Sequence, residues 1–74
     1  MQTFDITITG EFIKLDQLLK FANVAESGGM AKEMIADGIV KVDGETCTMR
    51  GKKIRPGNKV LIEFDDESML IQVC

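Results

Sequence analysis

The sequence has 74 residues, of which 45% are hydrophobic and 28% charged, and its formal net charge is −3. This length and composition are typical of one small globular domain, which we expect to comprise residues 1–74. No apolar run approaches the roughly 20 residues that a membrane-spanning helix requires. Acidic residues among the first twenty positions argue against a signal or transit peptide, so the sequence predicts a cytoplasmic protein.

The chain contains no histidine and only two cysteines, Cys47 and Cys74. Histidine is the commonest general base near neutral pH, and catalytic Ser-His and Cys-His pairs depend on it. Transition-metal sites in proteins mostly use histidine or closely spaced cysteines. The composition therefore predicts a protein that is not an enzyme and that binds neither a metal ion nor a cofactor.

The N-terminal part of the chain predicts one strand followed by one helix. Apolar and polar residues alternate from Thr3 to Thr9, as they do in a strand with one buried face. From Leu15 onward the apolar residues recur at helical spacing, which predicts a helix with one core-facing stripe. We expect this helix to end at Asn23, because asparagine tolerates the left-handed conformation found at helix C-termini.

A second, shorter helix is expected over residues 28–37. The Ser27 side chain can accept a hydrogen bond from the first backbone amides, and Gly38 can close the helix in the left-handed conformation. Two short helices joined by four residues form a hairpin that cannot bury its apolar stripes alone. The rest of the chain must therefore supply a surface for this hairpin.

The C-terminal half predicts that surface as a small sheet. Val40 and Val42 indicate a strand, and Asp43-Gly44 offers a tight hairpin turn into residues 45–48. Pro56-Gly57 indicates a second turn, and alternating apolar residues then predict strands over residues 60–64 and 69–74. The expected fold class is α+β, with a helical hairpin packed on a small sheet.

Basic residues are concentrated in one segment of the chain. Residues 46–62 contain five basic side chains and no acidic one, whereas residues 63–67 contain four acids. Because dissolved salt at about 0.1 M screens exposed charges beyond about 10 Å, a partner responds to the local patch more than to the net charge. The connection Arg50-Gly51-Lys52-Lys53-Ile54-Arg55 combines arginine and lysine groups that suit phosphate. The alternative is a solvated turn that keeps a small domain soluble.

A second candidate phosphate site precedes the second helix. Ser27-Gly28-Gly29 lies where helix N-terminal amides point outward, and Lys32 follows one turn later. The alternative is a flexible turn with an ordinary serine cap. Lys14, before the first helix, and Lys41, on the outward side of the hairpin, are either further contacts or ordinary surface lysines.

The chain has four phenylalanines, which mostly fit the apolar pattern, and it has no tyrosine or tryptophan. Proteins that bind single-stranded RNA usually present aromatic side chains on which bases stack. We therefore expect a preference for RNA hairpins or helical junctions over unstructured strands.

The order of these motifs resembles the small RNA-binding domain named after bacterial ribosomal protein S-four, which is also found in pseudouridine synthases and some tRNA synthetases. The resemblance covers roughly residues 13–60 in the family's order and spacing. It implies two helices packed on a small, strongly bent, mainly antiparallel sheet, the alpha-L RNA-binding motif, here with added N- and C-terminal strands. The matching residues are Lys14-Leu15-Asp16, Leu18-Leu19, Ser27, Ala31, Met34-Ile35, Gly38, Val40, Val42-Asp43-Gly44, Lys52 and Gly57.

The resemblance also implies an RNA surface formed by the helical hairpin and the neighbouring basic loop. Three positions depart from the family pattern: Gly28 and Lys14 stand where members often carry arginine, and Asp43 where they often carry asparagine. The Ser-Gly-Gly variant is similar to small free-standing bacterial members that consist of this domain alone. The residues expected to contact RNA are Lys14, Ser27, Gly28, Gly29, Lys32, Lys41, Arg50, Lys52, Lys53 and Arg55.

Together these features predict a monomeric, non-catalytic protein that binds structured RNA through a basic loop and a helix N-terminus. Ribosomal RNA and transfer RNA are the expected partners, and a ribosome or a ribosome assembly intermediate would present such RNA. Two alternatives remain open at this point. One is a ubiquitin-like protein-interaction adaptor, although sulfur-carrier members of that class end in Gly-Gly and this chain ends in Gln-Val-Cys. The other is an RNA-binding subunit of an RNA-modifying enzyme.

Overall fold

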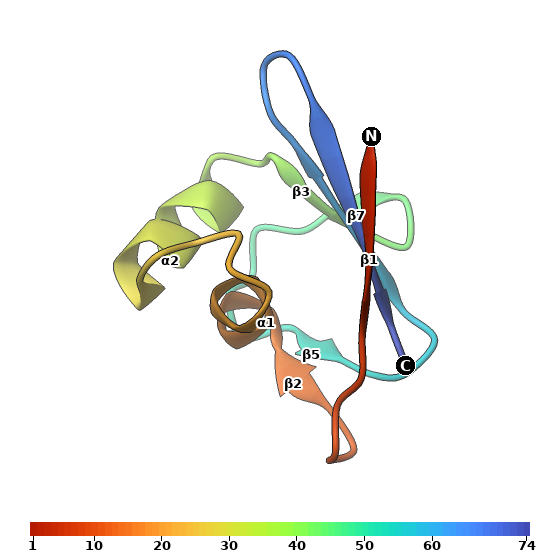
Figure 1. The fold of residues 1–74 in the computed structure, drawn as a ribbon. Helices are drawn as coiled ribbons and strands as arrows, with labels where there is room; N and C mark the ends of the chain where they lie inside the picture. The colour runs from red at the N-terminus through yellow and green to blue at the C-terminus, as the bar shows by residue number, and fades with distance from the viewer.

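The computed structural model describes all 74 residues and contains two helices and two sheets (Figure 1). The helices form a hairpin that packs against one face of the larger sheet, as the sequence predicts. Neither helix is long and apolar enough to cross a membrane. The elements are β1 (Gln2–Ile6), β2 (Ile13–Lys14), α1 (Leu15–Phe21), α2 (Gly28–Ala36), β3 (Val40–Val42), β4 (Glu45–Thr46), β5 (Lys53–Ile54), β6 (Lys59–Glu63) and β7 (Ser68–Val73).

The larger sheet has the strand order β1-β7-β6-β3-β4, and the smaller sheet pairs β2 with β5. All pairings are antiparallel except that of β1 with β7, which is parallel and runs from Gln2 opposite Met69 to Ile6 opposite Val73. The expectation of a mainly antiparallel sheet is therefore confirmed. The first strand is shorter than the predicted range from Thr3 to Thr9, because its only neighbour, β7, ends at Val73.

One apolar core joins the helical hairpin to the sheet. All 14 buried residues are hydrophobic and belong to a single cluster. Burying a side chain of leucine or isoleucine size contributes about 1.5–3 kcal/mol, so this cluster is the main source of stability. The helices contribute Leu15, Leu18, Leu19, Ala31, Met34 and Ile35, and the larger sheet contributes Val40, Val42, Val60, Ile62, Ile71 and Val73.

The predicted left-handed residues, the helix cap at Ser27 and the hairpin turn are present. The Ser27 Oγ accepts a hydrogen bond of 3.2 Å from the backbone N–H of Met30. Asn23 has a φ of 60° and Gly38 a φ of 79°, the left-handed conformations expected after the two helices. Helix α1 itself ends at Phe21, two residues before the expected stop. Asp43 and Gly44 both have positive φ, as a tight hairpin turn requires.

Two expectations from the sequence are wrong. The basic connection from Arg50 to Arg55 is not wholly a loop, because Lys53 and Ile54 form β5 and pair with β2. The phenylalanines do not mostly fill the core: Phe21 is 62% exposed, and Phe4 and Phe12 are each 38% exposed. Phe21 lies about 60° around the helix from Leu18 and about 160° from Leu19, at the edge of the buried stripe, so its ring is left mostly exposed.

Candidate nucleic-acid interface

The pairing of β2 with β5 brings together two candidate lysines that are far apart in the sequence. Ile13 lies opposite Ile54, and Lys14 lies opposite Lys53. Ile54 is completely buried, whereas both lysines are exposed. In an antiparallel pair, residues directly opposite each other have Cβ atoms about 4.5–5.5 Å apart. We call Lys14 and Lys53 the lysine pair.

The lysine pair is electrostatically unfavourable for the folded protein. Like charges directly opposite each other across two strands repel. Lys14 is also the N-cap residue of α1, where the positive end of the helix dipole disfavours a cation. The chain has 12 acidic residues, yet its only ion pair joins Lys41 Nζ to Glu63 Oε1 at 2.8 Å. Neither lysine of the pair therefore forms an ion pair within the protein.

The backbone of the basic connection is fixed to the start of α1. The backbone N–H of Leu15 donates to the carbonyl oxygen of Lys52 at 2.9 Å, and that of Asp16 donates to the carbonyl oxygen of Arg50 at 3.1 Å. These two bonds satisfy amides that a helix N-terminus otherwise leaves without a partner. The connection thus caps the helix with its main chain, which leaves its basic side chains at the surface.

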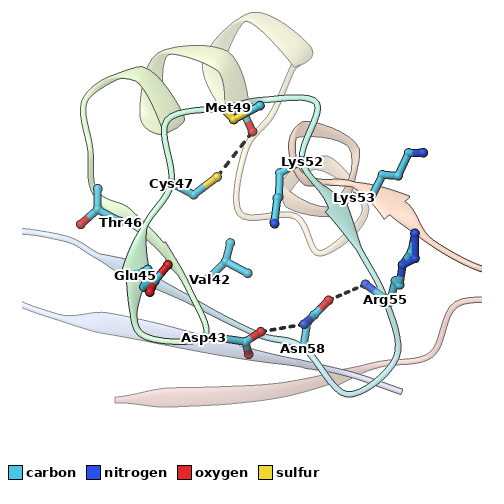
Figure 2. A pocket seen from close by; sticks show the side chains of 10 residues that line it. All are labelled: Val42, Asp43, Glu45, Thr46, Cys47, Met49, Lys52, Lys53, Arg55 and Asn58. Atoms are coloured by element: carbon cyan, nitrogen blue, oxygen red, sulfur yellow. Dashed lines mark hydrogen bonds between the residues drawn. The ribbon is translucent and has the colours of Figure 1, made fainter.

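An open pocket of about 550 Å³ lies between β5 and the β3–β4 hairpin (Figure 2). Figure 2 shows Lys52 pointing into this pocket, whereas Lys53 and Arg55 extend on the other side of β5. The pocket carries both signs of charge. Its lining residues are Val42, Asp43, Glu45, Thr46, Cys47, Met49, Lys52, Lys53, Arg55 and Asn58.

Asp43 holds the turn that positions Arg55. Its Oδ2 accepts a 2.6 Å hydrogen bond from Asn58 Nδ2, and its Oδ1 accepts one of 2.9 Å from the backbone N–H of Lys59. The Oδ1 of Asn58 in turn accepts a 2.7 Å bond from the backbone N–H of Arg55. The sequence identified Asp43 only as a turn residue, because its partners lie 15 and 16 positions away.

The second candidate site lies at the other end of α1. Ser27, Gly28 and Gly29 lie at or beside the start of α2, which follows the C-terminal end of α1. A seven-residue helix is about 10 Å long, so this group and the lysine pair are separated by roughly that length. A Cβ added to Gly28 would lie 4.0 Å from Cδ of Lys20, which adds a cation that the sequence analysis did not select.

Lys41 does not join either group. It alternates with the buried Val40 and Val42, so its side chain lies on the sheet face opposite the core. Its ammonium group is held by Glu63 on the neighbouring strand. The contact between Lys41 and RNA stays a prediction from the sequence alone, and Lys41 is not part of the surface proposed below, because Glu63 already holds its charge.

Comparisons with known proteins identify the family of this chain. A family model described as the S4 domain matches residues 6–72. The "Probable ribosome maturation protein RlbA" of Bacillus subtilis is 45% identical over 58 residues, which cover 78% of this chain and 82% of that protein. YbcJ of Escherichia coli is 46% identical over 48 residues, which cover 65% of this chain and 69% of YbcJ.

Solved structures share the fold. The solution structure of Escherichia coli YbcJ, described as having an alfaL motif involved in RNA binding, superposes with a TM-score of 0.59 and 38% identity, covering 97% of this chain and 87% of that one. The C-terminal domain of a tyrosyl-tRNA synthetase has a TM-score of 0.70 at 23% identity, covering 96% of this chain and 78% of that one, which shows a common fold. With the family model matched over residues 6–72, the chain belongs to the S4 domain family.

Proposed function

We propose that this protein binds structured RNA without catalysing a reaction, and that the lysine pair is the centre of the binding surface. The observation that carries the proposal is the placement of Lys14 opposite Lys53, with neither lysine in an ion pair. Two adjacent cations that weaken the fold are best explained by an anionic partner. Closely spaced phosphates along an RNA strand supply such an anion.

The neighbouring basic groups extend this surface. Arg50, Lys52 and Arg55 belong to the same connection, and none of them has an acidic partner within the protein. Arginine can grip a phosphate with two parallel hydrogen bonds, whereas lysine acts as a mobile point charge. If four or five phosphates are neutralised, the logarithm of affinity should fall with the logarithm of salt concentration with a slope of about −3 to −4.

The start of α2 would contact a second stretch of backbone. Ser27, Gly28, Gly29 and Lys32 form this part of the proposed surface, with Lys20 beside it. It lies about one helix length, roughly 10 Å, from the lysine pair, so a single RNA molecule can contact both groups.

The relatives support RNA as the partner, and the name of the Bacillus subtilis relative supports a ribosomal one. Crosslinking in cells, followed by sequencing of the bound RNA, would identify the target. Recovery of mainly ribosomal RNA is the expected result. Recovery of mainly transfer RNA would contradict the ribosomal assignment. Co-purification with a modifying enzyme would instead indicate an RNA-binding subunit.

Two double variants test the surface. Lys52→Gln with Arg55→Gln removes two charges from the basic connection, and Lys41→Gln with Lys59→Gln removes two from β3 and β6. Both change the net charge from −3 to −5. Titration of one RNA hairpin at several salt concentrations should show a slope reduced by about 1.4–1.8 for the first variant only. Equal effects of the two variants, or no binding by the unaltered protein, would overturn the proposal.

A further inference from the structure

Two of the three exposed phenylalanines border a second pocket, separate from the one in Figure 2. Phe12 and Phe21 line a hollow of about 380 Å³ together with Thr7, Ile8, Thr9 and Ile13. None of the six lining residues is charged. The volume is within the range of about 300–1,000 Å³ that is typical of small-molecule sites. The protein therefore presents an uncharged, partly aromatic pocket at its surface.

One residue of the lysine pair contacts a side chain that lines this pocket. Phe12 directly precedes β2 and lies two residues before Lys14. Lys53, opposite Lys14, places its Nζ 5.0 Å from the centroid of the Phe12 ring, which is a cation–π contact. One lysine thus belongs both to the proposed phosphate surface and to the rim of the aromatic pocket.

We propose that this pocket takes one unpaired base of the RNA, stacked against the phenylalanine rings, while the lysine pair holds an adjoining phosphate. The inference rests on the proposed function and specifies its substrate as folded RNA with an unpaired nucleotide. Every base has an aromatic face that stacks on phenylalanine. The Thr7 and Thr9 hydroxyls offer hydrogen-bonding groups for the polar edge of a base.

The positive rim favours a nucleotide over an apolar protein segment as the occupant. Each base is covalently linked to its own phosphate. A pocket for a base must therefore lie within one nucleotide's length of a phosphate site. In RNA, sequence-specific recognition targets loops and bulges, whose bases can be splayed out and stacked on aromatic side chains. The sequence predicted that the protein has no aromatic side chains available for stacking. The exposed phenylalanines of this pocket could serve that purpose under the present proposal.

Three RNAs of the same sequence context test the inference: a paired duplex, the duplex with one bulged adenine, and the duplex with an abasic nucleotide in the bulge. The abasic bulge keeps the backbone and its bend but removes the base. The unaltered protein should bind the adenine bulge about 5- to 150-fold more tightly than the abasic bulge. Phe12→Ala should reduce this ratio, and Phe21→Trp, which keeps an aromatic face, should preserve it.

Phe4→Ala is the matched control, because Phe4 and Phe12 are both 38% exposed and Phe4 does not line the pocket. It should leave the ratio unchanged. Because the readout is a ratio between two RNAs, partial unfolding of a variant cannot produce the expected result. Equal binding of the two bulged RNAs by the unaltered protein overturns this inference alone and leaves the pocket to a protein partner. Absence of binding to all three RNAs overturns the proposed function as well.

Discussion

Replacing Lys14 by glutamine should weaken RNA binding while leaving the fold as stable as before or more stable. The substitution removes the repulsion from Lys53 and the cation at the N-terminus of α1. Lys14 makes no side-chain capping hydrogen bond, so the helix loses none. Here the two effects should have opposite signs.

The expected magnitudes follow from the structure. A cross-strand charge pair is worth roughly 0.2–1 kcal/mol, and about 1 kcal/mol moves the melting temperature of a domain this small by about 4–8 °C. A rise of up to a few degrees at low salt is therefore expected, and it should shrink as salt screens the charges. Loss of one phosphate contact should reduce the salt slope by about 0.7–0.9, which corresponds to a roughly fivefold weaker affinity near 0.15 M salt.

Thermal melts and titrations of one RNA hairpin, each at several salt concentrations, would measure both quantities. Lys41→Gln is the control, because it also removes one lysine charge but breaks the ion pair with Glu63. It should cost at most about 1 kcal/mol of stability and leave the salt slope unchanged. A Lys14→Gln variant that lost stability, or a slope equally reduced in both variants, would refute the reasoning.

Three further outcomes are expected. Gly29→Asp should lower RNA affinity and raise stability by about 0.3–1 kcal/mol, because a carboxylate is favoured at a helix N-terminus. The side chain has room, since a Cβ at Gly29 would meet only Ser27 Oγ, at 3.9 Å. An unchanged affinity in a titration would show that this helix start does not contact RNA. Asp43→Ala should lower the free energy of unfolding by about 1–3 kcal/mol in chemical denaturation, because it removes two hydrogen bonds. Asp43→Asn should lower it less, because asparagine accepts a hydrogen bond and tolerates positive φ. Equal losses in the two variants would contradict this reasoning. Leu18→Ala should cost about 2–5 kcal/mol in the same assay, and a loss below 1 kcal/mol would contradict its place in the core.

Local features of the fold were predictable because their causes lie within a few residues. The left-handed conformations of Asn23 and Gly38 and the cap at Ser27 depend on neighbouring backbone groups alone. The parallel pairing of β1 with β7 has no local cause, because the register between distant segments is set by packing of their buried faces.

The candidate site was predicted in composition but not in arrangement. A two-residue strand is too short to show alternation, so nothing in the sequence pairs Lys14 with Lys53. The exposure of Phe21, in contrast, had a signal: its position in the helix lies at the edge of the stripe that contains Leu18 and Leu19. The prediction that Phe21 fits the apolar pattern rested on its hydrophobicity and not on its position around the helix.

The main-chain bonds between the basic connection and α1 place different constraints on the composition and the length of that segment. The carbonyl groups of Arg50 and Lys52 cap the helix whatever side chains these residues carry. Point substitutions can therefore change the chemistry of this surface at little cost to the fold. An inserted residue would shift both carbonyls and uncap the helix. Relatives that bind different RNAs should accordingly differ in the side chains of this segment while keeping its length.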